Sequence, residues 1–261
     1  NGTTGGIVAM FARGSVIIDG AINVDGAGFR GGPIDENTTD FHNGCTNPDG
    51  FPNLGYAPRG EGTSRKRFAV EETLNALTNG PAAYGGGGGG GACHNGGGGG
   101  GGHGGAGGRG GDTYVNTVGY DPGRFADGGG RLVYEPRQRL SFGGGGGEGE
   151  RNDSPGTKLP GGNGGGAVFL RAKALRGSGA ISARGTNGGM NPGDSGTGGG
   201  AGGLVLLDIE DPSACIDVDV GGGSGGDNDN NGGPGGGGGP GRVAGRASCA
   251  KLVGLPGAAG K

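Results

Sequence analysis

Residues 85–102 read GGGGGGGACHNGGGGGGG, two runs of seven glycines separated by four residues. Glycine supplies 81 of the 261 residues, and ordering a glycine costs roughly 0.5 to 1 kcal/mol more than ordering an alanine. Runs without side chains have no apolar surface to bury, so hydrogen bonds between the backbones of neighbouring runs must offset that cost. We therefore predict that the glycine runs are packed structural elements and that the protein is first of all a scaffold.

The glycine pattern excludes two familiar alternatives. Collagen needs glycine at every third position with abundant proline, whereas these glycines are consecutive and prolines number 14. A glycine/serine linker would be mobile rather than packed. The remaining arrangement is a bundle of extended, left-handed polyglycine II-like helices with three residues per turn. It resembles the architecture of glycine-rich antifreeze proteins and phage tail-tip adhesins.

Apolar residues concentrate in three units, at about 6–26, 166–185 and 204–220, which glycine-rich stretches separate. Each unit reads as two short strands, because apolar and polar residues alternate with a period of two, as in Ile22-Asn23-Val24-Asp25. We predict a single domain over residues 1–261 that is mainly β with irregular glycine-rich loops. A small sheet or sandwich core would anchor the packed polyglycine helices. The irregular spacing of the units argues against a regular solenoid.

Two further segments give weaker signals. Arg131–Tyr134 with Leu140–Phe142 resembles the strand units and is predicted as a fourth pair of strands. Arg67–Leu77 has partly helical spacing of apolar residues and is the one helix candidate. We therefore expect almost no α-helix.

Composition and charge limit the functions open to this chain. Hydrophobic residues make up 30% of the sequence and tryptophan is absent, so any apolar core must be thin. A net charge of −3 provides no basic surface for nucleic acid. The longest good apolar run is Leu204–Leu207, far short of the ~20 residues of a membrane span. We expect no nucleic-acid partner and no membrane insertion.

The four cysteines are far apart in the sequence and none forms a C-x-x-C pair. An even number without metal-binding spacing favours two disulfides and an oxidising, extracellular or cell-surface location. Three pairings remain open, and sequence proximity favours Cys45 with Cys93 and Cys215 with Cys249. The cysteines are Cys45, Cys93, Cys215 and Cys249.

A candidate calcium site lies in the sequence Asp227-Asn228-Asp229-Asn230-Asn231-Gly232. Asp227, Asp229 and Asn231 place oxygen ligands at positions 1, 3 and 5 before a turn glycine, as at the start of a calcium loop. Position 12 is Gly238 instead of a glutamate. The alternative is a solvated turn between glycine runs.

Catalytic motifs are not specific in this chain. G-x-G-x-x-G occurs repeatedly, as expected at this glycine content, without the strand and helix that a dinucleotide site needs. His42, His94 and His103 lack metal-binding spacing and are interpreted as structural residues that bond backbone carbonyls at the ends of glycine helices. We predict that the protein is not an enzyme and holds no cofactor beyond the candidate calcium.

Non-glycine residues recur at intervals within the glycine-rich segments. The quoted segments are GAGFRGG at 26–32, GEGT at 60–63, GACHNG at 91–96, GGNGGGAV at 161–168 and GTNG at 185–188. With these landmarks the chain resembles the glycine-rich surface domains of myxobacterial adventurous-gliding motility proteins and related exported bacterial proteins. That resemblance implies an extracellular or cell-surface structural domain and carries over no catalytic residues.

Two classes of function remain. The first is a structural subunit of an extracellular filament or cell-surface assembly, with the chain as its own partner in a homopolymer. Apolar strands with unpaired edges are association sites, and the residues assigned to this contact are Ile7, Val8, Met10, Phe11, Leu204 and Leu206. The second is a surface adhesin, or a ligand- or ice-binding module, that displays loops on the polyglycine scaffold, with a surface glycan as one ligand.

Overall fold

The computed structural model describes residues 6–34, 57–63, 83, 85–91, 95–112, 125–151, 158–211, 216–228, 232–246, 251–253 and 255–261. Over these ranges the chain is mainly β, its sheets are parallel and it contains no helix. The coarse fold prediction is therefore confirmed. The helix candidate Arg67–Leu77 lies outside the described residues.

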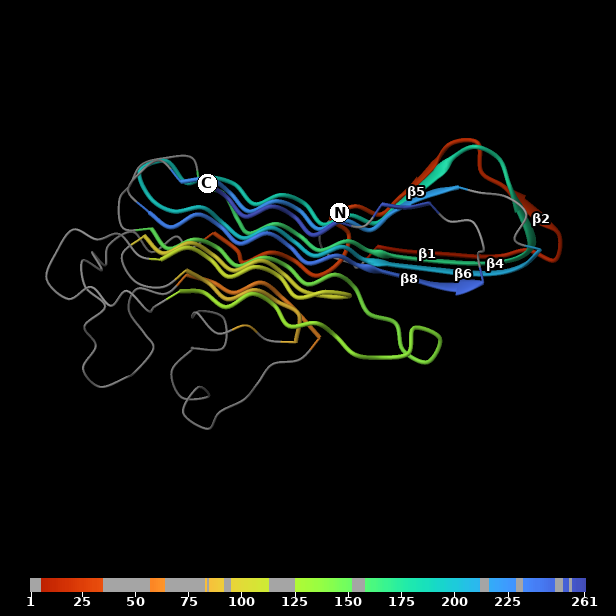
Figure 1. The fold of residues 1–261 in the computed structure, drawn as a ribbon, viewed down its shortest axis with the longest axis horizontal. Helices are drawn as coiled ribbons and strands as arrows, with labels where there is room; N and C mark the ends of the chain where they lie inside the picture. Colours follow the sequence, from red (N-terminus) through yellow and green to blue (C-terminus); the bar gives the residue numbers. More distant parts are fainter. Residues whose placement is uncertain are drawn as a thin grey trace, which may run out of the picture.

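The strands form two sheets, and within each sheet all paired strands run parallel (Figure 1). Sheet A contains, in spatial order, β1 (Ile7–Phe11), β4 (Ala167–Arg176), β6 (Leu204–Asp211) and β8 (Arg242–Arg246), and β2 (Ser15–Ile17) also pairs with β4. Sheet B contains β3 (Ala21–Asn23), β5 (Ala180–Ser182), β7 (Asp217–Asp219) and β9 (Lys251–Val253). All three predicted units contain strands.

The chain passes four times from a strand of sheet A to a strand of sheet B, and we call each passage a rung. The strands of the four rungs are β1 to β3, β4 and β5, β6 and β7, and β8 and β9. They stack in register, so that one row across sheet A contains Ile7, Ala167, Leu204 and Arg242. The fourth rung was not predicted from the sequence. The predicted strands in Arg131–Tyr134 and Leu140–Phe142 are wrong, because neither segment forms a strand.

Alternation along the strands gives them one apolar face, whose side chains form a buried cluster. The buried cluster contains Val168 and Leu170 from β4, Val205 and Leu207 from β6, and residues of sheet B such as Ile181. Opposite side chains of β4, including Arg171 and Lys173, are exposed. A period-two pattern with one apolar face produces this division.

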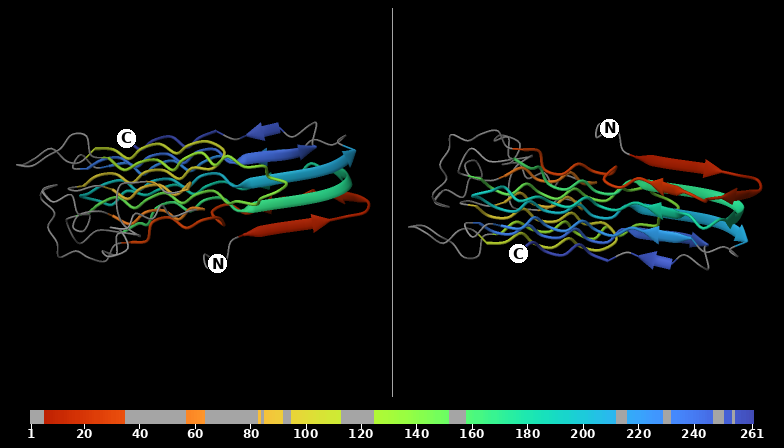
Figure 2. Two further views of the ribbon diagram at one scale, coloured as in Figure 1. Left: turned by 90° about the horizontal axis from the view of Figure 1, so that it is seen from below. Right: turned by 90° about the horizontal axis from the view of Figure 1, so that it is seen from above.

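Glycine-rich tracts run side by side away from the sheets (Figures 1 and 2). Their N–H groups bond to neighbouring tracts in rotation, as residues 97–103 demonstrate. Residues 97, 100 and 103 donate to Gly111, Gly108 and Gly105; residues 98 and 101 donate to Gly196 and Gly199; residues 99 and 102 donate to Gly89 and Gly86. Every third residue therefore faces the same neighbour.

The tract at residues 143–148 repeats this rotation. Residues 143 and 146 donate to Gly165 and Gly162, residues 144 and 147 to Gly102 and Gly99, and residues 145 and 148 to Glu61 and Pro58. Neighbouring tracts are so close that a Cβ on Gly101 would lie 2.1 Å from the carbonyl oxygen of Gly144. Glycine is therefore required here for the close approach of two backbones.

Candidate functional site

The first and fourth rungs are the two ends of the stack and form the candidate functional site. β1 and β8 lie at opposite edges of sheet A, and β3 and β9 at opposite edges of sheet B (Figure 2). Among the described residues no strand pairs with the outer edge of any of these four strands. Unpaired strand edges expose backbone donors and acceptors to a further strand.

The backbone of β1 is divided between its two edges. The N–H of Ala12 donates to Arg171, and the carbonyl of Gly6 accepts from Ala167. A parallel ladder uses alternate residues of each strand, so the even-numbered residues of β1 face β4. The N–H and C=O groups of Ile7, Ala9 and Phe11 consequently lie on the outer edge.

The hydrophobic cluster is closed in the middle of the stack and open at its ends. Val168 and Leu170 in the second rung and Val205 and Leu207 in the third are buried. Their first-rung counterparts Val8 and Met10, and Val243 in the fourth rung, are only partly buried. In stacked-repeat proteins such terminal positions are normally sealed by a cap with a polar outer face.

Large apolar side chains are exposed on the first rung. Ile7, Phe11 and Ile17 are 53%, 69% and 66% exposed. Phe11 contacts the ring of Phe169 on β4, with 5.2 Å between the ring centroids. Grouped exposed apolar residues of this kind are typical of a contact surface rather than of a solvated edge.

Leu204 and Leu206 differ from the other residues assigned to assembly. Both are buried in β6, which lies between β4 and β8. The assignment of these leucines to an unpaired strand edge is therefore corrected, because β6 pairs on both sides with strands of the same chain. Ile7, Val8, Met10 and Phe11 all lie in the edge strand β1.

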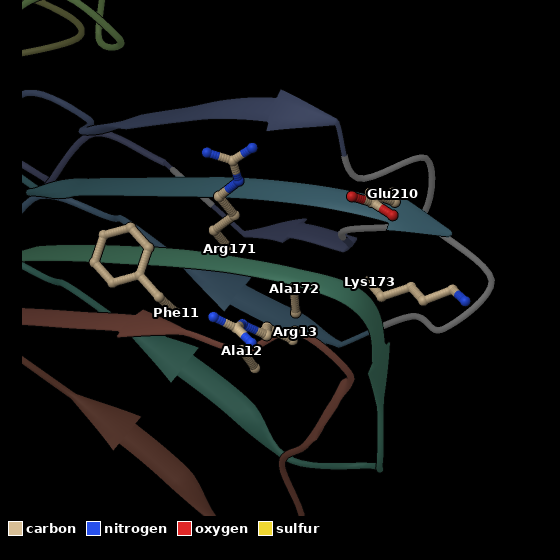
Figure 3. A pocket seen from close by; sticks show the side chains of 7 residues that line it. All are labelled: Phe11, Ala12, Arg13, Arg171, Ala172, Lys173 and Glu210. Atoms are coloured by element: carbon tan, nitrogen blue, oxygen red, sulfur yellow. The ribbon is translucent and has the colours of Figure 1, made fainter.

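A shallow pocket of about 460 Å³ lies beside the end of β1 (Figure 3). It is lined by Phe11, Ala12 and Arg13 of the first rung, Arg171, Ala172 and Lys173 of β4, and Glu210 of β6. Arg171 is 3.7 Å from Asp208, which partly neutralises it. An aromatic ring beside several cations can bind an anionic ligand with an apolar face.

His103 is buried at the end of a glycine tract. Its Nδ1 lies 2.8 Å from the carbonyl oxygen of Gly202, and its Nε2 lies 2.5 Å from the hydroxyl of Tyr134. The pKa of His103 is lowered to about 4, chiefly by burial and also by the nearby charge of Arg242, although the hydrogen bond to Gly202 opposes this shift. Burial also raises the pKa of Tyr134 to about 12. The carbonyl contact agrees with the structural role expected for this histidine.

Arg242 connects this group to the fourth rung. Its guanidinium lies 4.7 Å from the ring centroid of Tyr134, and Nη1 donates to the Tyr134 carbonyl at 3.0 Å. Nη2 donates to the carbonyl of Leu132. These contacts fix the segment around Tyr134 against the start of β8.

Buried carboxylates occupy the far end of the tract at residues 143–150. Glu148 and Glu150 are both buried, and the N–H of Asn95 donates to Oε2 of Glu150 at 2.5 Å. Burial raises the pKa of Glu150 well above its ordinary value, and Asp194 and Glu148 raise it further. Glu148 also lies 3.4 Å from Nε of Arg151. The group joins three chain segments through backbone and side-chain bonds.

The calcium candidate is only partly described. Oδ1 of Asp227 accepts from the N–H of Lys261 at 2.8 Å, whereas Asp229 and Asn231 lie outside the described residues. Within the described ranges no group of three His, Cys, Asp or Glu residues is placed to hold a metal ion. All four cysteines and both His42 and His94 also lie outside the described residues.

Comparison of the chain with protein-family models, curated proteins and solved structures gives no match. In the part of the chain that the structure describes, no helix is long and apolar enough to cross a membrane.

Proposed function

We propose that this chain is a structural subunit of an extracellular filament or cell-surface assembly. The observation that carries the proposal is the rotating pattern of backbone hydrogen bonds, in which residues 97–103 bond to three different tracts. A body built in this way uses its backbone for packing, and among its described residues the outer edges of β1, β3, β8 and β9 are left for self-association.

The rotation supports a polyglycine II-like bundle. A helix with three residues per turn directs every third N–H to the same side, which is the periodicity of the tracts at 97–103 and 143–148. Positive φ is found among the described glycines only at Gly26, Gly85, Gly86, Gly177, Gly193 and Gly245. The interior of both tracts therefore has the sign of φ that a left-handed extended helix of this type needs.

The buried cluster supports a sandwich core. Val168 and Leu207 from sheet A and Ile181 and Val218 from sheet B belong to the same cluster. Two sheets that share inward-facing apolar residues pack face to face in a sandwich. This core would hold the base of the glycine bundle together.

Extracellular location rests on the sequence. The resemblance to glycine-rich surface domains and the even number of cysteines both favour it. Two disulfides would restrict the unfolded chain, which matters for a protein with a thin core. Alkylation of the native, unreduced protein should modify none of the cysteines, and mass spectrometry after reduction should then find four reactive thiols.

Electron microscopy and light scattering of the purified chain test the function. We expect long filaments of uniform width whose axial repeat corresponds to one subunit. A protein that stays monomeric at high concentration under several salt and pH conditions would contradict a structural subunit.

The second candidate function is a binding module, and the pocket beside Phe11 favours it. Three cations, Arg13, Arg171 and Lys173, line that pocket with one carboxylate, Glu210. This excess of positive charge suits an anionic surface glycan. Binding to an array of anionic glycans should fall at least about tenfold in Arg13→Ala and Lys173→Ala and stay constant in Arg131→Ala, a change outside the pocket. Equal binding by all three variants would contradict the proposal that this pocket binds the glycan.

A further inference from the structure

Successive rungs repeat one packing step. Val8, Val168, Val205 and Val243 form a row of four valines across sheet A. In sheet B the corresponding row contains Ile22, Ile181, Val218 and Leu252. Every position in both rows is an apolar residue of similar size, including the positions in the first and fourth rungs. A row that ends on an apolar residue can accept one more rung of the same kind.

We propose that the fourth rung of one copy receives the first rung of the next copy, in the parallel register that the rungs have within the chain. Val243 would then lie opposite Val8 of the next copy, and Leu252 opposite Ile22 of the next copy. This proposal rests on the proposed function and names the surface through which the subunits assemble.

The edges on both sides have backbone groups in suitable positions. The N–H of Arg242 donates to Gly203, so residues 242, 244 and 246 face β6 and Val243 and Gly245 face outward. On the other side, Ile7, Ala9 and Phe11 face outward. A copy translated along the stack presents a strand in the same direction, and its outward-facing groups can continue the parallel ladder.

The glycine tracts favour translation over two-fold docking. A two-fold axis perpendicular to the strands would pair them in antiparallel orientation and place the glycine bundles of the two copies at opposite ends. Translation instead brings the tract at 255–261 beside the tract at 26–32 of the next copy. Neighbouring rungs already make this contact within the chain, since Gly185 donates to Gly221 and Gly222 donates to Leu255.

Pro256 makes the junction weaker than an internal step. Gly26, Gly185 and Gly222 each stand three residues after the last strand residue of sheet B in their rung. The N–H of each one donates to the next rung, and we call this set of aligned positions the donor row. Pro256 occupies this row in the fourth rung and has no N–H to donate. One bond to the next copy is therefore missing, and the junction should separate before the subunit unfolds.

The contact is heterologous and open, because the surface on the first rung differs from the surface on the fourth. Such an interface propagates into a fibre when repeated by translation. It would also cover the partly buried residues Val8, Met10 and Val243 and the exposed residues of β1.

Two proline variants of the full chain test the proposal. Ala9→Pro and Val243→Pro each remove an N–H that faces outward, so the ladders within the chain stay intact. Each variant alone should remain monomeric at concentrations where the wild type polymerises. An equimolar mixture should give a dimer of one copy of each, because every variant retains one intact surface. Thermal unfolding controls for folding. If a proline variant fails to fold, Val8→Asp replaces Ala9→Pro on the first rung, and Val243→Asp replaces Val243→Pro on the fourth.

Pro256→Ala supplies a gain-of-function arm. Restoring an N–H in the donor row should lower the critical concentration for assembly several-fold. Variants that still form filaments, or that stay monomeric when mixed, would overturn this junction and leave the filament function standing. A wild-type chain that never assembles would overturn the function itself.

Discussion

Leu207 in sheet A and Gly101 in a glycine tract are both enclosed by the chain, yet different groups hold them. Leu207 is stabilised by apolar side chains of the shared cluster. Gly101 has no side chain, and its N–H donates to Gly199 at 2.9 Å while its carbonyl accepts from Gly239 at 2.8 Å. One half of the molecule is thus packed by side chains and the other by backbone, so the same substitution should have different effects in the two halves.

The largest effect should come from adding a methyl group to a tract. In Gly101→Ala the Cβ would meet the backbone of Gly144 at 2.1 Å and 2.6 Å, and backbone cannot rotate aside as a side chain can. We expect a loss of more than about 4 kcal/mol in the free energy of unfolding, measured by urea denaturation.

The matched control is Gly130→Ala. A Cβ on Gly130 would meet nothing within 4 Å, so this change should be neutral or stabilise by up to about 1 kcal/mol through the unfolded state. Equal losses in both variants would contradict backbone packing as the reason that the tracts need glycine.

Removing side chains tests the other half of the molecule. Met10 and Leu170 stand in the same row of sheet A, one in the open first rung and one in the closed second rung. Leu170→Ala should cost about 3 to 4 kcal/mol, because Leu170 is fully buried. Met10→Ala should cost about 1 kcal/mol in the monomer, and calorimetry of both variants measures the difference. Similar costs would mean that the core is closed at the first rung.

The pH dependence of the free energy of unfolding tests whether His103, at the end of a glycine tract, is buried and neutral. Native His103 stays neutral down to a pKa of about 4, whereas an unfolded histidine protonates near 6.5. Its contribution is complete above pH 6.5 and is lost as the pH falls towards 4, by an amount on the order of 3 kcal/mol. Urea denaturation at several pH values should find this loss in the wild type and not in His103→Gln.

The contribution of Glu150 to stability changes with pH in the opposite direction to that of His103. Burial raises its pKa from an ordinary value of 4.5, so its native state prefers the proton and its contribution declines as the pH rises above 4.5. Because wild type and His103→Gln both contain Glu150, its contribution cancels when their free energies of unfolding are subtracted at each pH. A difference that is constant from pH 4 to 7 would contradict a buried, neutral His103.

The smallest effect should come from an exposed ion pair between two tracts. Nε of Arg30 donates to Oε1 of Glu61 at 2.9 Å, and the Arg30 side chain is 62% exposed. Solvent screens such a pair, so Arg30→Gln should change the free energy of unfolding by less than about 1 kcal/mol. A larger loss by denaturation would mean that side chains, and not backbone alone, hold these tracts.

The sequence predicts the sheets where its signal is strong. Alternation around Ile22 and Ile181 predicts strands, because one face must be buried. The fourth rung was missed because Arg242-Val243-Ala244-Gly245-Arg246 holds a single large apolar residue. A spacing of 37 residues from Ala167 to Leu204 (204 minus 167) and of 38 from Leu204 to Arg242 (242 minus 204) is the signal that could have found it.

Long-range register could not be predicted, since 160 residues separate Ile7 from its partner Ala167 (167 minus 7). Local alternation specifies which face of a strand is buried but not which strand lies beside it. The contacts of His103 with Gly202 and Tyr134 were hidden for the same reason, although the sequence did assign a carbonyl-bonding role to that histidine. Leu204 and Leu206 were assigned to assembly because the sequence does not reveal β8 as their neighbour.

Hydrogen–deuterium exchange at residues 97–103 tests the central claim most directly. If backbone bonds to three neighbouring tracts hold this run, all seven N–H groups should exchange orders of magnitude more slowly than glycines of an unstructured peptide. Protection should be as strong there as at Leu170 and Leu207 in the sheets. Exchange at the unprotected rate along the run, with protection confined to the sheets, would contradict the account of a glycine scaffold held by its backbone.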